Sequence, residues 1–143
     1  MIYAIDGRIR NKAVLDFYIP ALIKALGLNR LSKPLVEIEF KNKVSAYGYC
    51  EGDRDYVKIT IAKKCPVTGR KLGFIEMMQT LAHEMVHARQ FLRGELVAEG
   101  VWKWKGRNGA DYKYENQPWE KEAYRLEKVL FQDCFPFHIK FTN

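Results

Sequence analysis

The chain has 143 residues, a formal net charge of +7 and 48% hydrophobic residues. This length corresponds to one domain that can bury a sizeable core, and the absence of low-complexity tracts, repeats and linkers excludes a disordered or fibrous protein. No apolar run approaches membrane-spanning length and no secretory signal peptide is evident, so we expect an intracellular, cytoplasmic protein. Cys50, Cys65 and Cys134 have no Cys-x-x-Cys spacing, which indicates reduced, partly buried thiols.

The N-terminal half predicts one helix followed by three strands. Residues 11–26 have an apolar helical pattern that is broken or begun afresh at Pro20 and ended by Gly27. Three short runs rich in β-branched and aromatic residues follow, at 35–41, 44–49 and 56–62. We interpret these runs as an antiparallel meander, which together with the later helices predicts an α+β fold and not alternating βαβ units.

Residues 72–93 predict a helix with two distinct faces. Apolar residues recur every three or four positions, at Phe74, Met78, Leu81, Met85, Ala88 and Leu92, and Gly94 is a plausible stop. The opposite side carries a polar stripe of Glu76, Thr80, His83, His87 and Gln90. Because the helix is otherwise largely apolar, this stripe suggests a lined site rather than a solvated face.

The most informative residues are the run His83-Glu84-Met85-Val86-His87. Its four-residue spacing places both imidazoles on one helix face, where they can ligate one metal ion, with Glu84 to the side. Zinc would lower the pKa of a water molecule, and Glu84 could take its proton and pass it to a leaving amine. The alternative is that these are surface residues on an ordinary amphipathic helix.

The segment 95–115 alternates aromatic and basic residues in two stretches, Trp102-Lys103-Trp104-Lys105 and Tyr112-Lys113-Tyr114. With a glycine-rich turn at 106–109 between them, they predict a β-hairpin. One aromatic face would pack on the core, and the other face or the loop would overhang the metal cleft and help to hold substrate. Tyr112 or Tyr114 could also donate a hydrogen bond to a developing oxyanion.

A catalytic zinc site usually has three protein ligands, so a third ligand must be found. His138 lies in an apolar tail, where a structural histidine is expected, so we expect a carboxylate. The candidates are Glu95, Glu99, Asp111, Glu120 and Glu122. The last two open a predicted helix, 118–131, with Asn116 as a possible cap and a core stripe of Trp119, Ala123, Leu126 and Leu130. They flank that stripe on opposite sides, so periodicity alone leaves both open.

Residues 70–130 resemble the SprT-like zinc metallopeptidases, in particular short versions from phages and bacteria. The resemblance lies in 81–88 around the histidine motif, in 102–106, in Tyr112 and in 118–124. It implies a minimal zincin-like domain. SprT and Spartan proteins commonly use a histidine as third ligand, which this region lacks. Glu120-Lys121-Glu122-Ala123 instead resembles the Glu-x-x-Ala element of ImmA-like peptidases, which implies Glu120 as the ligand.

We therefore expect a zinc-dependent metallopeptidase in which His83, His87 and Glu120 hold Zn2+ and Glu84 is the general base. An extended protein or peptide substrate could add to a sheet edge beside the metal helix. The basic residues near the hairpin (Lys103, Lys105, Arg107, Lys113) and before the metal helix (Lys63, Lys64, Arg70, Lys71) are compatible with DNA or another acidic partner, although such a surface is often only a solubility device. Spartan relatives cleave DNA-attached proteins, which makes DNA-associated substrates worth testing. Two alternatives are a nucleic-acid-binding module with a structural metal and a zinc amidase acting on a non-protein amide.

Overall fold

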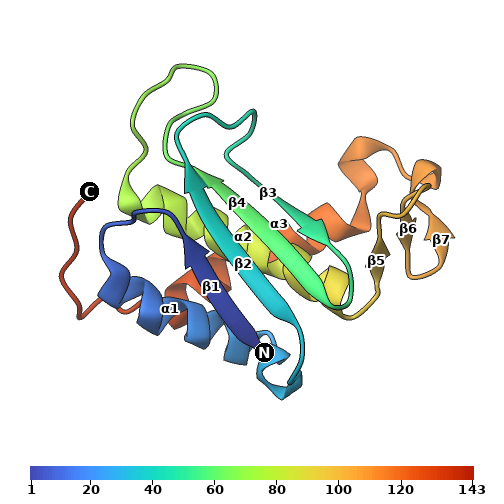
Figure 1. The fold of residues 1–143 in the computed structure, drawn as a ribbon. Coiled ribbons are helices and arrows are strands. Elements are labelled where there is room, and N and C mark those ends of the chain that lie inside the picture. The colour runs from blue at the N-terminus through green and yellow to red at the C-terminus, as the bar shows by residue number, and fades with distance from the viewer.

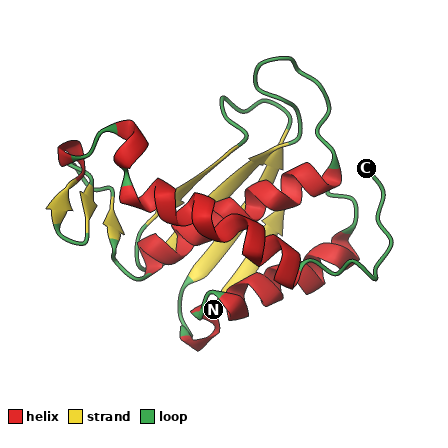
Figure 2. Cartoon of the chain, turned by 180° about the vertical axis from the view of Figure 1, so that it is seen from behind, coloured by secondary structure: helices red, strands yellow, loops and turns green.

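A computed structural model describes residues 1–143 as a sheet with helices packed against one of its faces (Figures 1 and 2). The strands are β1 (Ile2–Asp6), β2 (Leu35–Lys41), β3 (Gly48–Gly52) and β4 (Tyr56–Ala62), in the spatial order β1-β2-β4-β3. β1, β2 and β4 are parallel, and β3 pairs antiparallel with β4 at the edge. The α+β class is confirmed.

The helices α1 (Lys12–Ala25) and α2 (Phe74–Leu92) lie on the inner face of the sheet, and α3 (Pro118–Cys134) packs against these two helices. Alternate residues of the central strands point into this layer; they are Val36, Ile38, Phe40, Val57, Ile59 and Ile61. The outer face is polar, and Lys58 forms ion pairs there with Glu37 at 3.8 Å and Glu39 at 3.1 Å. Burial on one face only therefore fixes the register of the strands.

The predicted antiparallel meander is wrong. β2 and β4 are parallel neighbours, and the chain between them crosses to the edge, forms β3 and returns through a tight turn. β3 also begins at Gly48, four residues later than the predicted start, and β1 was not predicted. The last four residues of β4 are all buried.

The three helices follow the sequence pattern closely. α1 runs through Pro20 without a break and ends before Gly27, whose φ of 71° is left-handed. A short 3-10 helix, η1 (Leu28–Arg30), follows. α2 lies within the predicted 72–93, and Gly94 has a φ of 70° just after it. α3 starts at Pro118 as predicted, but its N-cap is Gln117, without a side-chain hydrogen bond, and not Asn116.

The predicted hairpin exists in a shorter form, within a small sheet of β5 (Leu96–Val97), β6 (Lys103–Trp104) and β7 (Arg107–Asn108). The turn is Lys105-Gly106, because both residues have positive φ, 47° and 84°, as a two-residue hairpin turn requires. The stretch 112–114 is therefore not the second strand. It follows one 3-10 helix, η2 (Gly109–Asp111), and its last residue begins another, η3 (Tyr114–Asn116).

The helices and the cysteines bear on two further expectations, about membrane crossing and about the thiols. None of the helices has both the length and the apolar character that a membrane crossing requires. Cys65 and Cys134 are buried and Cys50 is partly buried, and all three are free thiols in this structure.

Candidate metal centre and cleft

α2 presents His83, Glu84 and His87 on the side that faces β3 and α3. The opposite side of the helix is fixed in the core, where Leu81 and Met85 are fully buried. Because His83 and His87 are one turn apart, their ring nitrogens approach each other, and the two Nε2 atoms are 3.3 Å apart. A rigid, buried helix thus holds both imidazoles on the same side.

α3 brings Glu120 to these histidines. Its Oε1 lies 2.8 Å from His87 Nε2 and 3.2 Å from His83 Nε2. The preceding residue, Trp119, is buried and packs near Trp104 and Tyr112, with ring centres 6.3 and 6.0 Å away. The aromatic contacts of the small sheet therefore fix the first turn of α3, and with it the position of Glu120.

The arrangement of His83, His87 and Glu120 fits a metal ion. Each offers one ligand atom, and these atoms all lie within 4.8 Å of one another. A tetrahedral zinc site with metal–nitrogen distances of about 2.0–2.1 Å has ligand atoms about 3.3 Å apart. The three separations here, 3.3, 3.2 and 2.8 Å, are close to that value. This His-His-Glu group could hold a metal ion in the manner expected from the sequence.

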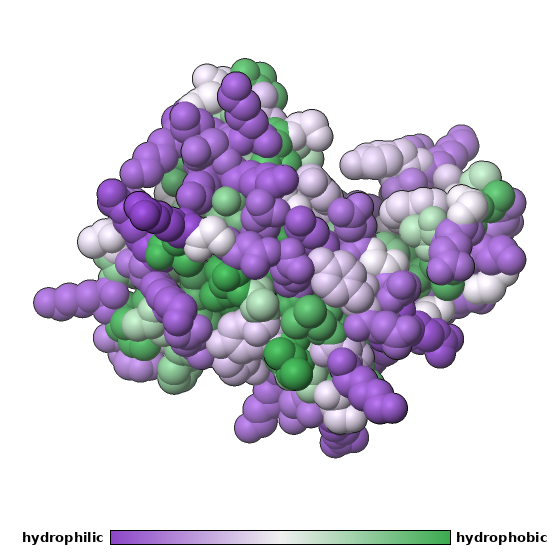
Figure 3. All heavy atoms as spheres, in the orientation of Figure 1, coloured by the Kyte–Doolittle hydropathy of each residue, from purple (hydrophilic) through white to green (hydrophobic).

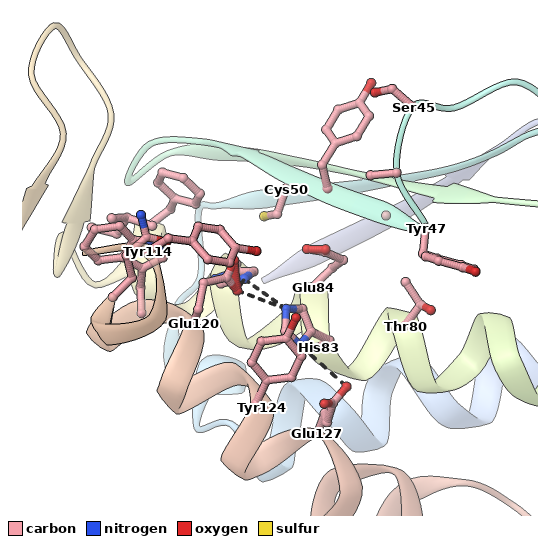
Figure 4. Close-up of a pocket in the computed structure, with 18 of the residues that line it drawn as sticks. Ser45, Tyr47, Cys50, Thr80, His83, Glu84, Tyr114, Glu120, Tyr124 and Glu127 are labelled. Atoms are coloured by element: carbon pink, nitrogen blue, oxygen red, sulfur yellow. Dashed lines mark hydrogen bonds and ion pairs between the residues drawn. The ribbon is translucent and has the colours of Figure 1, made fainter. Parts of the chain in front are cut away.

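The other nitrogen of each imidazole also has a partner. His87 Nδ1 lies 2.8 Å from Gln90 Oε1, and His83 Nδ1 lies 3.5 Å from Glu127 Oε2. An acceptor at Nδ1 keeps the proton there and leaves Nε2 free to ligate a metal. Figure 4 shows Glu127 and Tyr124 rising from α3 beside His83, and the Tyr124 ring centre is 4.7 Å from that of His83.

Glu84 lies between α2 and the edge strand β3, on the side of His83 opposite α3 (Figure 4). It is only 4% exposed, and burial raises its pKa to about 6, although the two histidines oppose that shift. β3 approaches closely because residue 48 is glycine: a Cβ there would lie 2.7 Å from Thr80 Cγ2 and 3.3 Å from Glu84 Cγ. Glu84 is thus a confined carboxylate next to His83, His87 and Glu120, which form the candidate metal-binding group.

The charges of the ligand group are strongly coupled. Partial burial would raise the pKa of Glu120, but hydrogen bonds from His83 and His87 lower it to about 2. Burial would lower the pKa of His87, yet its contacts with Glu120 and Glu84 raise it. Glu120 is therefore ionised at neutral pH, which is the form that ligates a metal.

A cleft of about 990 Å³ opens over these residues. Its walls come from β3 with the loop before it, from α2, from the start of α3 and from the small sheet; in Figure 3 the surface is hollowed between the main body and the part that carries β5–β7. The lining includes Glu84, Glu120 and Glu127 but no lysine or arginine, despite the net charge of +7. The cleft is thus the acidic part of a basic protein.

The other candidate ligands lie elsewhere. Glu122 Oε1 accepts hydrogen bonds from Gln90 Nε2 at 3.2 Å and Arg89 Nη2 at 3.5 Å, so it faces away from the histidines. Glu95 pairs with Lys105, and Asp111 pairs with Arg107. Glu99 is exposed and lies outside the cleft.

The remaining histidine and the two predicted tyrosines have different environments. His138 is exposed and stands edge-on to Phe17, away from the cleft. Tyr114 lines the cleft, whereas Tyr112 packs against Trp119 outside it.

Tyr124 and Glu127 were not singled out from the sequence. They follow Glu120 by four and seven residues, so they lie on the same face of α3. That spacing was a usable signal, but it acquires meaning only once Glu120 is known to face the histidines.

Comparison of the chain with protein-family models and with curated proteins found no match.

Replacing Glu120 with alanine should abolish metal binding, whereas Glu122→Ala should leave it intact. Only Glu120 shares its oxygen with both histidines, and Glu122 pairs with Gln90 and Arg89. Elemental mass spectrometry of protein purified without chelators or a histidine tag gives the metal content per chain. Thermal melting verifies that both variants are folded. Metal retained in folded Glu120→Ala, or lost equally from both variants, would contradict this assignment.

Glu127→Ala should weaken metal binding about tenfold, because loss of an outer partner of a ligating histidine typically costs 10- to 100-fold and this contact is long. Glu127→Gln keeps an acceptor oxygen and should retain most of the affinity. Competition with a chromophoric chelator measures the change, and Asp133→Ala, an exposed carboxylate further along α3, is the matched control. Wild-type affinity in Glu127→Ala would show that Glu127 does not orient His83.

Proposed function

We propose that this chain is a zinc-dependent metallopeptidase. The observation that carries the proposal is the convergence of His83, His87 and Glu120 beside the buried carboxylate of Glu84. Three protein ligands with an open cleft in front are typical of catalytic zinc, whereas structural zinc sites are closed by four protein ligands. The imidazole and carboxylate ligand set fits zinc.

In this proposal each residue has a defined task. His83, His87 and Glu120 hold the ion, and Gln90 and Glu127 orient the two imidazoles. When bound, zinc supplies Lewis acidity, which promotes the ionisation of water and polarises a carbonyl oxygen. Glu84 takes the proton of the attacking water and then transfers it to the leaving amine nitrogen.

The edge strand β3 supports a peptide as the substrate. One side of β3 pairs with β4, and no other strand pairs with its outer side. Gly48, Tyr49 and Cys50 of this strand line the cleft beside Glu84. An extended peptide that adds to this edge would bring a backbone carbonyl next to the metal-binding group. This favours a peptide over a compact non-protein amide.

Membership of the SprT-like peptidases is part of the same proposal. Its support is the set of motifs between residues 70 and 130, together with the meeting of the histidine motif with Glu120 of the Glu-x-x-Ala element. A zincin-like arrangement agrees with an edge strand that runs beside the metal helix.

Glu84→Gln should lower proteolytic activity by a factor of about 10² to 10⁴ while leaving the zinc content unchanged. The amide keeps the shape of the side chain but cannot accept the proton. Release of fluorescent fragments from a labelled, unfolded protein measures activity, and Glu99→Gln, an exposed site outside the cleft, is the matched control. Unchanged activity in a metal-replete Glu84→Gln protein would contradict the mechanism.

We also propose that an acidic partner, DNA in the first instance, contacts the basic side chains around β6 and β7. Lys103 and Lys113 are exposed, and neither forms an ion pair. Because the cleft lining contains no lysine or arginine, the proposed contact lies beside the cleft and not inside it. Proteins attached to DNA would then be suitable substrates.

The double variant Lys103→Glu and Lys113→Glu should weaken DNA binding and reduce the slope of log affinity against log salt concentration by about 2. Fluorescence anisotropy with labelled single- and double-stranded DNA over a salt series measures both quantities. Lys12→Glu with Lys128→Glu, on α1 and α3, is a control of equal charge change. Equal weakening by both pairs would indicate a nonspecific effect of net charge.

A further inference from the structure

The cleft continues past His87 into an apolar end. Its walls are formed by Phe91, Leu96, Trp102 and Trp119. Phe91 follows His87 by one turn of α2, and Trp119 directly precedes Glu120. This end therefore adjoins the metal-binding group, and a substrate held there would place its neighbouring bond beside Glu84.

Three of these walls are buried, and the fourth is partly open. Phe91 and Leu96 are each 2% exposed and Trp119 is 5% exposed, whereas Trp102 is 44% exposed. The ring centre of Trp102 is 6.4 Å from that of Phe91 and 6.3 Å from that of Trp119. The indole thus rests on a fixed aromatic base and leaves apolar surface that a ligand can cover.

The position of Trp102 depends on Gly109. The Gly109 amide donates a hydrogen bond of 2.6 Å to the Trp102 carbonyl oxygen. A Cβ at residue 109 would lie 2.9 Å from that oxygen and 3.2 Å from Trp102 Cβ. Any side chain at 109 would push Trp102 away, so the close packing of this loop sets the width of the apolar end.

The apolar end of the cleft differs in charge from the rest of the cleft. The cleft lining includes the carboxylates of Glu84, Glu120 and Glu127, whereas none of the four apolar walls carries a charge. A charged side chain placed in this end would lose hydration without gaining a partner. A large apolar side chain would cover the exposed surface of Trp102 at no such cost.

We propose that this apolar end is the specificity pocket for a large apolar or aromatic side chain next to the scissile bond. The inference rests on the proposed peptidase function, which it deepens by naming the substrate class. Such side chains are buried in folded proteins, so the preferred substrates are unfolded or flexible segments that expose phenylalanine, leucine or similar residues.

Peptide hydroxamates test the pocket without requiring turnover, because the hydroxamate binds the metal directly. In two series of compounds, phenylalanine, leucine, alanine, lysine or glutamate stands on one or the other side of the hydroxamate. Affinity is measured by calorimetry on the zinc-loaded full chain. In one series we expect phenylalanine and leucine to bind at least about tenfold more tightly than alanine, lysine or glutamate.

Trp102→Ala should reduce the preference for phenylalanine over alanine several-fold, and Trp102→Phe should keep most of it. Phe17→Ala is the matched control, since Phe17 is a 50% exposed aromatic residue on α1 that lies outside the cleft. Gly109→Ala, which displaces Trp102 without removing it, should lower the preference as well.

The outcomes separate this inference from the proposed function. Tight binding of all hydroxamates regardless of the side chain, or an unchanged preference in folded Trp102→Ala, overturns the pocket and leaves the metal site standing. Side-chain-dependent binding without hydrolysis of any peptide supports the pocket and overturns the peptidase. If no hydroxamate binds to the zinc-loaded protein, both the apolar pocket and the proposed peptidase function are overturned.

Discussion

The buried amide of Gln90 is the contact on which the metal-binding group depends. This side chain is fully buried, so each of its polar atoms needs a partner within the protein. Its oxygen accepts from His87 Nδ1, and its nitrogen donates to the Trp119 carbonyl oxygen at 2.9 Å and to Glu122. One residue therefore sets the orientation of a histidine on α2 and the position of α3. An unsatisfied buried group would cost about 1–3 kcal/mol, which penalises any other arrangement of the two helices.

The second constraint is electrostatic. Three carboxylates gather around two imidazoles in a cleft without lysine or arginine, in a chain whose net charge is +7. The cations of the chain lie outside this cleft, although nearby positive charge would relieve the repulsion among Glu84, Glu120 and Glu127. A divalent ion held by His83, His87 and Glu120 would supply that charge from within the cleft. Binding of the ion would then also stabilise the folded chain, because the unfolded chain does not hold the three ligands together.

The elements that local periodicity determines could be predicted from the sequence. α2 and α3 have apolar stripes of helical spacing, and the histidine motif places its two imidazoles by the geometry of one turn. The order of the strands could not be predicted, because the parallel pairing of β2 with β4 joins segments that are distant in the chain and leaves no local signature. The hairpin turn was misplaced because Lys105, a residue that rarely adopts positive φ, occupies a turn position where glycine or asparagine is usual.

The choice between Glu120 and Glu122 shows where a helical pattern stops being informative. Both residues flank the core stripe of α3, and only the crossing of α3 over α2 decides which flank meets the histidines. That crossing depends on Trp119, which is held by the small sheet, and on the Gln90 amide, so the assignment needs contacts among three separate segments. Glu127 and Tyr124 follow from the same crossing, since they share the face of Glu120.

The edge strand β3 links these constraints to the proposed peptide substrate. An unpaired strand edge invites association with other chains, and proteins usually shorten, charge or cover such edges. β3 is short, but its outer edge lies beside the cleft and Glu84, and Gly48 brings its backbone against α2. A side chain at residue 48 would push β3 away from α2 and so separate the strand from His83, His87 and Glu120. The glycine therefore lets the edge strand pack against α2 directly beside Glu84, which keeps the outer strand edge and this carboxylate on the same cleft.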